Sequence, residues 1–150
     1  MLVTLNKGFT LVEILVTLAI VSILVVIASP SFISVIKRDR LVTNANHLHN
    51  TFKYARSEAI KREQDVNIIT TGAQWSVTTE ANGEIVELKA FNIEHDSISI
   101  NLDDVNITSN GVLAAKREYL ITDADPSTID LTLCILQSGQ SWTVKEPELC

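Results

Sequence analysis

The sequence predicts an α+β protein in which a long N-terminal helix packs on an antiparallel β-sheet domain. Residues 9–65 show helical patterning, first as a continuous apolar run and then as one apolar stripe. From Val66 onward the pattern changes to short alternating segments separated by turns, which is typical of antiparallel strands. With 150 residues the chain has the length of one domain of ordinary size.

The apolar run covers residues 9–29, and Glu13 is its only charged residue. At about 1.5 Å per residue such a helix spans roughly 30 Å, the thickness of the bilayer hydrocarbon. The run therefore predicts a single membrane-spanning helix, with a kink at residues 26–30 because Pro30 removes a backbone donor. More basic residues follow the run than precede it, which by the positive-inside rule places the C-terminal part in the cytoplasm.

Beyond the apolar run the helix is predicted to continue as an amphipathic segment over residues 30–65. Its apolar residues recur at spacings of three and four and form one stripe: Leu41, Ala45, Leu48, Phe52, Ala55 and Ala59. This stripe is the face expected to pack on the sheet. The charged run Arg56–Arg62 is interpreted as a solvated helix face, and the helix is expected to end near Glu63–Asp65.

The remaining residues, 66–150, predict the β-rich domain. Strands are expected at 66–70, 75–79, 85–91, 97–102, 119–122, 128–136 and 141–145. Asn82-Gly83 separates the second strand from the third and is a strong signal for a two-residue hairpin, and Asn110-Gly111 marks another turn. Several short strands joined by turns indicate an antiparallel sheet.

The charge of this part excludes several functions. From Val66 onward four basic residues face thirteen acidic ones, a formal charge of −9. A field of that sign repels phosphate backbones, which disfavours nucleic-acid binding. No nucleophile–base arrangement and no phosphate loop is present in the sequence, so we expect no catalytic residue, no cofactor and no enzyme activity.

Two cysteines, Cys134 and Cys150, lie close to the C-terminus. The pair is compatible with one disulfide in an oxidising compartment, or with two reduced thiols in the cytosol. A disulfide here would close a loop of about 15 residues and stabilise the fold by roughly 3 kcal/mol. Two cysteines without a nearby histidine fall short of a zinc site, so no metal is expected. A disulfide would place the C-terminal part outside the cytoplasm, whereas the basic residues that follow the apolar run place it inside.

Glu13 is a carboxylate within an apolar run, and two interpretations of it are open. It can snorkel to the membrane interface, which costs less than the ~2.5–3.5 kcal/mol of a charge at the bilayer centre. Alternatively it pairs with a cation within the membrane. If the peptide bond after Gly8 is cut, the new α-amine of Phe9 is such a cation, four residues away.

The stretch Lys7-Gly8-Phe9-Thr10-Leu11-Val12-Glu13-Ile14-Leu15 resembles the processing motif of type IV pilins and type II secretion pseudopilins. The resemblance implies that a prepilin peptidase cuts between Gly8 and Phe9 and methylates the new N-terminal Phe9. It also implies that Glu13 serves subunit docking and that the C-terminal domain lies in the periplasm. Residues 5–66, including Ala55–Arg62, are similar to the FimT/GspH group of minor pilins.

The resemblance also implies the domain organisation and the partners. Residues 1–8 are the cleaved leader, 9–29 the transmembrane and assembly helix, 30–65 its amphipathic continuation and 66–150 the periplasmic β-rich pilin domain. In the periplasm the disulfide Cys134–Cys150 is favoured. The expected partners are other pilin or pseudopilin subunits through the N-terminal helix, the prepilin peptidase and the inner membrane.

The expected function is that of a minor pilin or pseudopilin, a structural subunit of a type IV pilus or a type II secretion pseudopilus. One alternative is a FimT-like minor pilin that binds DNA for natural transformation. This chain departs from that pattern, because its tail 139–150 carries one lysine and two glutamates where that group is basic and Gly-Arg-rich. A further alternative is a membrane-anchored protein with no assembly partner, which would keep Met1 as its N-terminus.

Overall fold

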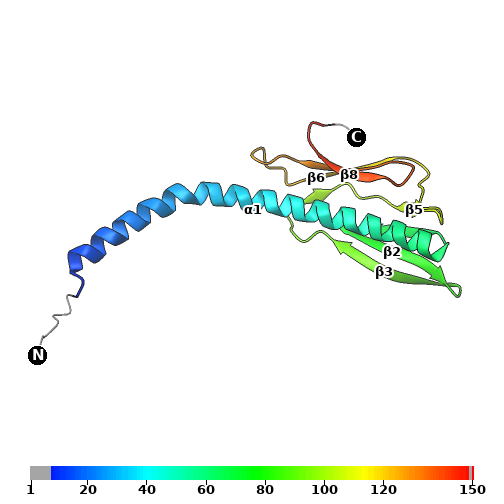
Figure 1. Cartoon of the computed structure of the whole chain (residues 1–150), viewed down its shortest axis with the longest axis horizontal. Helices are drawn as coiled ribbons and strands as arrows, with labels where there is room; N and C mark the ends of the chain where they lie inside the picture. The colour runs from blue at the N-terminus through cyan, green and yellow to red at the C-terminus, as the bar shows by residue number, and fades with distance from the viewer. Residues whose placement is uncertain (1–7, 149) are drawn as a thin grey trace, which may run out of the picture. The chain divides into compact units, whose positions relative to one another are not determined.

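The structure, a computed structural model, describes residues 8–148 and residue 150, and of residues 27–31 the backbone alone. It divides into two compact units, residues 1–36 and Lys37–Cys150. One helix, α1, is followed in the chain by eight described strands, β1 to β8 (Figure 1). The predicted α+β class with the helix first is confirmed.

Helix α1 runs over Leu11–Arg62, 52 residues, and remains helical through Pro30. The kink was predicted for residues 26–30, and the side chains of residues 27–31 lie outside the described part of the structure. The helix ends with Glu63 in the left-handed region at φ 53°. The N–H groups of Glu63 and Gln64 then donate to the carbonyls of Ile60 and Ala59 at 3.3 and 3.2 Å, a Schellman motif that satisfies the last turn.

The first sheet contains β1 (Val66–Thr71), β2 (Gln74–Ala81), β3 (Glu84–Asn92) and β5 (Val105–Ile107). Its order is β3-β2-β1-β5, and all three pairings are antiparallel. The predicted β2–β3 hairpin is confirmed, since Asn82 and Gly83 both have positive φ, at 55° and 81°, as a type I′ turn requires. Strand β5 was not predicted, because three residues are too few for an alternating pattern to be recognised.

The second sheet contains β4 (Ser99–Ile100), β6 (Arg117–Thr122), β7 (Leu131–Ile135) and β8 (Ser141–Lys145), in the order β4-β6-β7-β8. Two of these strands are shorter than predicted. At 97–102 the N–H of Ile98 bonds locally to the carbonyl of His95 at 2.9 Å, so only two residues join the ladder. Before β7, the Thr128 hydroxyl donates to Asp123 Oδ1 at 2.5 Å and holds a loop where a strand was expected.

Both sheets lie against the C-terminal part of α1 (Figure 1). The predicted stripe is confirmed as the helix side of this core, because each of its members is at most 1% exposed: Leu41, Ala45, Leu48, Phe52, Ala55 and Ala59. On the sheet side the rings of Trp75 and Tyr119 meet edge to face, with centroids 4.8 Å apart. The core thus joins one strand from each sheet to the helix stripe.

Tyr119 carries a polar group into this core. Its hydroxyl donates to Asp103 Oδ1 at 2.5 Å, while the indole N–H of Trp75 donates to the Asp103 carbonyl at 3.1 Å. Burial, followed by the neighbouring Asp103 carboxylate, raises the pKa of Tyr119 well above its ordinary value. Asp103 therefore satisfies both aromatic donors from one position at the edge of the core.

Candidate processing and assembly site

The predicted cleavage junction lies immediately before the helix. Gly8, Phe9 and Thr10 are exposed and outside regular structure, and the predicted leader up to Lys7 lies outside the described residues. A Cβ built on Gly8 would meet nothing within 4 Å, so no contact within the described residues demands glycine there. An exposed, non-helical peptide bond is the conformation that a peptidase can reach.

Thr10 caps the helix and positions Glu13. The Thr10 hydroxyl oxygen accepts a hydrogen bond from the Glu13 N–H at 3.2 Å, and the Thr10 carbonyl accepts from the Ile14 N–H at 3.3 Å. Thr10 is therefore the N-cap and Glu13 the third helical residue, a capping geometry. A carboxylate in the first turn is favoured by the positive end of the helix dipole. The structure thus places Glu13 one helical turn after the predicted junction.

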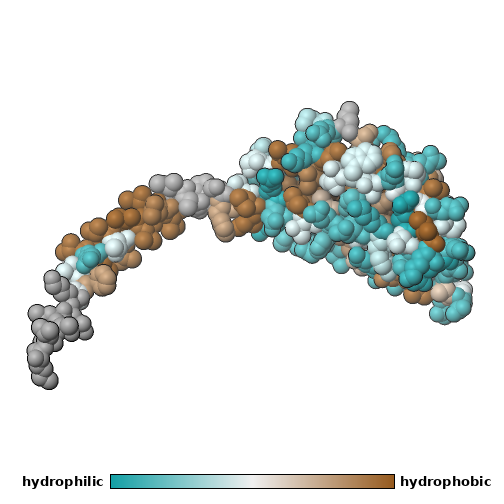
Figure 2. Space-filling model, in the orientation of Figure 1, coloured by the Kyte–Doolittle hydropathy of each residue, from teal (hydrophilic) through white to brown (hydrophobic). Residues whose placement is uncertain are grey.

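The helix surface that follows Glu13 is apolar and exposed among the residues that the structure describes. Large apolar side chains between Phe9 and Val26 are from 48% exposed at Ile14 to 80% exposed at Phe9, and Figure 2 shows apolar residues gathered along this part of α1. The hydroxyls of Thr17 and Ser22 donate to carbonyls of their own helix, at 2.8 and 2.7 Å. Such a surface requires cover by other apolar groups.

Among the residues that the structure describes, no helical stretch combines the length and the apolarity needed to cross a bilayer.

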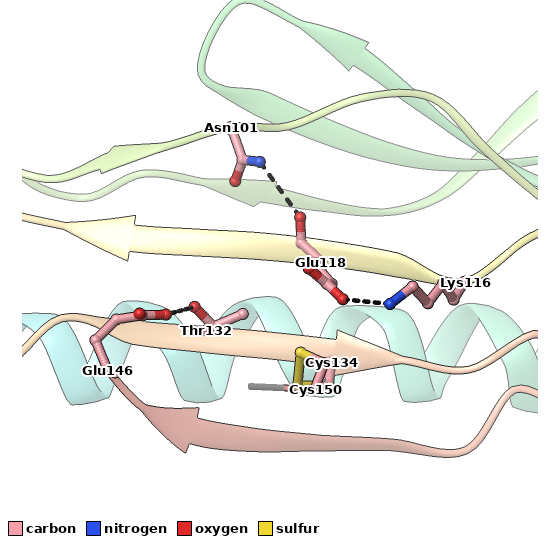
Figure 3. Close-up of a disulfide and its surroundings, with 7 residues drawn as sticks. All are labelled: Asn101, Lys116, Glu118, Thr132, Cys134, Glu146 and Cys150. Atoms are coloured by element: carbon pink, nitrogen blue, oxygen red, sulfur yellow. Dashed lines mark hydrogen bonds and ion pairs between the residues drawn. A yellow bond between two sulfur atoms is a disulfide. The ribbon is translucent and has the colours of Figure 1, made fainter. Parts of the chain in front are cut away.

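The two cysteines form a disulfide at the other end of the chain (Figure 3). Cys134 is fully buried on β7, and its Cα lies 5.5 Å from that of the terminal Cys150. The loop between them spans a sequence separation of 16, for which the chain-entropy model gives about 3 kcal/mol of stabilisation. The bond therefore fastens the chain end to the second sheet.

Acidic side chains surround this end of the chain. Glu146 accepts a hydrogen bond from the Thr132 hydroxyl at 2.5 Å, and Glu118 pairs with Lys116 at 2.8 Å (Figure 3). Within the described residues no group of three or more His, Cys, Asp or Glu side chains is arranged to hold a metal ion. The carboxylates here belong to surface hydrogen bonds and ion pairs.

The interpretation of Arg56–Arg62 as a solvated face was wrong in part. Lys61 and Arg62 are exposed, but Glu58 is 8% exposed, and Arg56 is half-buried. The Arg56 Nε–H donates to the Gly111 carbonyl at 2.8 Å, and its Nη2 donates to the Ser138 carbonyl at 3.3 Å. Arg56 thus ties the helix to a turn after β5 and to the β7–β8 turn. The two glycine-containing turns were visible in the sequence, but their meeting at one arginine was not.

Ion pairs hold the C-terminal unit at both ends of its helical part. Lys37 pairs with Asp125 in the loop before β7, and that pairing lowers the pKa of Asp125. Arg62 Nε–H donates to Glu58 at 2.7 Å, and this hydrogen bond lowers the pKa of Glu58. Between them, burial and the nearby charge of Lys53 lower the pKa of His49, whose Nε2 lies 2.9 Å from the Ser141 hydroxyl.

A capped apolar helix with a first-turn carboxylate, continued into a helix that packs on two antiparallel sheets, defines a pilin-like protein. The family of Type II transport protein GspH matches residues 44–145, and the prokaryotic N-terminal methylation motif matches residues 4–29. The chain belongs to the GspH family. It is a minor pilin or pseudopilin, a structural class of protein, and its N-terminal motif is that of a membrane-anchored component of a pilus or pseudopilus.

Solved structures agree with this fold. The type IV minor pilin FimU of Pseudomonas aeruginosa PAO1 is 23% identical, with a TM-score of 0.61 over 73% of this chain and 90% of that chain. A second crystal form of FimU is 22% identical, with a TM-score of 0.59 over 69% of this chain and 92% of that chain. The minor pseudopilin EpsH from the Type 2 Secretion System of Vibrio cholerae is 11% identical, with a TM-score of 0.58 over 73% of this chain and 99% of that chain.

No curated protein sequence matches the chain at a significant level. Nothing in these comparisons supports the alternative of a DNA-binding minor pilin.

Proposed function

We propose that the chain is made as a precursor whose leader, residues 1–8, is removed by prepilin peptidase between Gly8 and Phe9. The same enzyme then N-methylates Phe9. The exposed, non-helical backbone from Gly8 to Thr10 supports this proposal, because a peptidase binds extended chain and cannot act inside a helix. Since no described residue apart from its chain neighbours lies within 4 Å of a Cβ built at Gly8, the demand for glycine comes from the enzyme.

Before assembly, residues 9–29 anchor the protein in the inner membrane as a single-pass helix, with residues 30–65 continuing that helix. Residues 66–150 then lie in the periplasm. The disulfide supports this orientation, because disulfides persist in oxidising compartments such as the bacterial periplasm. The mature protein acts as a structural subunit of a type IV pilus or type II secretion pseudopilus, without a catalytic role.

Assembly places the apolar part of α1 among the helices of neighbouring subunits, where Glu13 pairs with the methylated Phe9 amine of a neighbour. The observation that carries this proposal is the N-terminal cap. The cap at Thr10 places Glu13 in the first turn of the helix, and no hydrogen bond or ion pair joins the Glu13 carboxylate to another described residue, which leaves it available to a partner. A carboxylate taken into an apolar bundle is costly unless it is paired, so docking and charge neutralisation occur together.

The test uses the full chain in cells that assemble filaments. Mass spectrometry of the mature protein should find N-methylated Phe9 as the first residue, and an N-terminus that remains Met1 would refute the processing step. Glu13→Ala and Glu13→Gln should both be cleaved yet incorporate poorly into sheared filaments.

Asp39→Asn is the matched control, because Asp39 is an exposed carboxylate on the same helix outside the apolar run. Its incorporation should equal that of the unmodified chain. Normal incorporation of Glu13→Gln would contradict the pairing of Glu13 with an amine.

A further inference from the structure

A groove lies between α1 and the start of β8, entirely within the unit Lys37–Cys150. Its volume is about 590 Å³. The helix supplies one wall, with Lys53, Arg56, Ser57 and Ile60. The β7–β8 turn and the start of β8 supply the other, residues 139–142. No carboxylate lines it, although the whole chain has a formal charge of −6. We name it the Arg56 groove.

Arg56 is held rigidly in this groove. Its two hydrogen bonds to the carbonyls of Gly111 and Ser138 use two of the five N–H groups of a guanidinium. Gly139 makes this approach possible, because a Cβ there would overlap Arg56 Nε. A fixed guanidinium with donors to spare loses little side-chain entropy when it binds an anion, which is the preorganisation that favours recognition.

A second cation stands beside Arg56. Lys53 lies three residues earlier on the same helix, is exposed, and forms no ion pair with any residue that the structure describes. A hollow on the second sheet has the opposite character, since Glu118, Asp130, Glu146 and Glu148 line it. The Arg56 groove is therefore a local reversal of the charge of an acidic domain.

Apolar surface flanks the two cations. Ile60 is 45% exposed and Trp142 is 37% exposed, one on each wall of the groove. Arginine and tryptophan are among the residues most enriched where a protein partner binds tightly. The groove thus combines two cations with two apolar side chains.

We propose that the Arg56 groove receives an acidic segment of a neighbouring subunit in the filament. A carboxylate of that segment pairs with the Arg56 guanidinium and with Lys53, and an adjacent apolar side chain lies against Trp142 and Ile60. Charge complementarity selects this occupant, since guanidinium and carboxylate match in planar geometry. The proposal rests on the proposed function, because it places the neighbour within an assembled filament.

A nucleic acid fits these observations less well. Its backbone carries a charge about every 1.7 Å of duplex, and binding proteins track it with many cations. The groove offers two cations, Lys53 and Arg56, and the chain from Val66 onward carries four basic against thirteen acidic residues, so no such track is present. A single acidic peptide segment needs no more than the groove offers.

The test places a benzoylphenylalanine photo-crosslinker at Gln140 in the full chain, in cells that assemble filaments. Illumination should join it to another filament subunit, and mass spectrometry should locate the adduct in a segment carrying Asp or Glu beside an apolar residue. Lys53→Glu should lower the yield about tenfold through like-charge repulsion, and Lys53→Ala should lower it less.

Lys145→Glu is the matched control, with the same charge change on an exposed lysine of β8 outside the groove, and it should leave the yield unchanged. An adduct with nucleic acid, with lipid or with a segment lacking acidic residues would overturn the proposal. So would a yield that Lys53→Glu does not alter, or no adduct from a chain that is processed and present in sheared filaments. Absence of the chain from filaments would refute the proposed function itself, and the groove proposal with it.

Discussion

The two parts of α1 use apolar residues for different purposes. Between Phe9 and Val26 the large apolar side chains are about half exposed or more, whereas the stripe from Leu41 to Ala59 is at most 1% exposed. Both parts are helical, but the first is an almost continuous apolar run, whereas the second is amphipathic and carries a stripe of Leu, Ala and Phe. The difference lies in what covers them: the stripe is buried by the chain's own sheets, whereas the described apolar side chains of the N-terminal part are exposed.

This contrast predicts that the two parts respond oppositely to the same kind of truncation. Phe52→Ala should lower the free energy of unfolding by about 3–5 kcal/mol, because it leaves a cavity in the core. Denaturant unfolding of the detergent-solubilised full chain, followed by tryptophan fluorescence, measures the change. Leu18→Ala, at a side chain that is 58% exposed, should leave the unfolding midpoint unaltered and should weaken incorporation into filaments. Equal loss of stability in both variants would erase the distinction between the two parts.

The disulfide strengthens only the C-terminal unit. Removing it with the pair Cys134→Ala and Cys150→Ala should cost about 3 kcal/mol, because the unfolded chain regains the freedom of a loop with a sequence separation of 16. The same unfolding experiment with and without reductant checks this. Reductant should shift the midpoint of the unmodified chain to that of the double variant, and an effect of reductant on the double variant would refute the assignment.

Close packing in the C-terminal unit is also tested by two glycines with positive φ. Gly139→Ala would push a Cβ into Arg56 and the Gly111 carbonyl, whereas Gly72→Ala meets nothing within 4 Å. Both variants pay the backbone cost of an L-residue at positive φ, about 1–2 kcal/mol. Overpacking should cost Gly139→Ala about 1–3 kcal/mol more, measured as the difference between their unfolding free energies. Equal losses would mean that the Arg56 contact adjusts freely.

The core of the C-terminal unit should also limit stability in alkali. Folding raises the pKa of Tyr119, because the buried hydroxyl stays protonated. The stability that Tyr119 contributes is therefore complete below the pKa of an unfolded tyrosine, about 10, and is lost as the pH rises above that value. Between pH 10 and 11 this should weaken folding by about 1 kcal/mol. Tyr119→Phe should lose less stability over the same interval. An identical pH slope for both chains would contradict the assignment.

The smallest expected effect lies where the helix ends. Glu63 adopts φ 53°, a conformation that favours glycine, so Glu63→Gly should stabilise the protein by up to about 1 kcal/mol. Glu63→Ala is the control, since it keeps the Cβ and should gain nothing. A thermal scan of the three chains gives the comparison, and stabilisation by alanine would assign the effect to the carboxylate instead.

Sequence patterns were reliable where one local rule decides the structure. Helical spacing marked every member of the buried stripe, and Asn82-Gly83 marked the β2–β3 turn, because each depends on a few neighbouring residues. The strand at 97–102 was predicted too long, since a local hydrogen bond to His95 interrupts an alternating pattern that looks regular. Alternation reports which side chains face a core, and it does not report where backbone pairing stops.

By itself the sequence determined the assembly end of this protein. The proposed junction at Gly8–Phe9, the carboxylate of Glu13 and the apolar run are adjacent in the chain, so their relation is fixed by covalent spacing and helix geometry. The tertiary structure alone decided the Arg56 groove. Its lining comes from one face of α1 and from residues 139–142, and the Gly111 carbonyl holds Arg56 in place. Nothing local in any of these segments specifies the others. They meet because burying the stripe on two sheets draws separate turns onto one face of the helix.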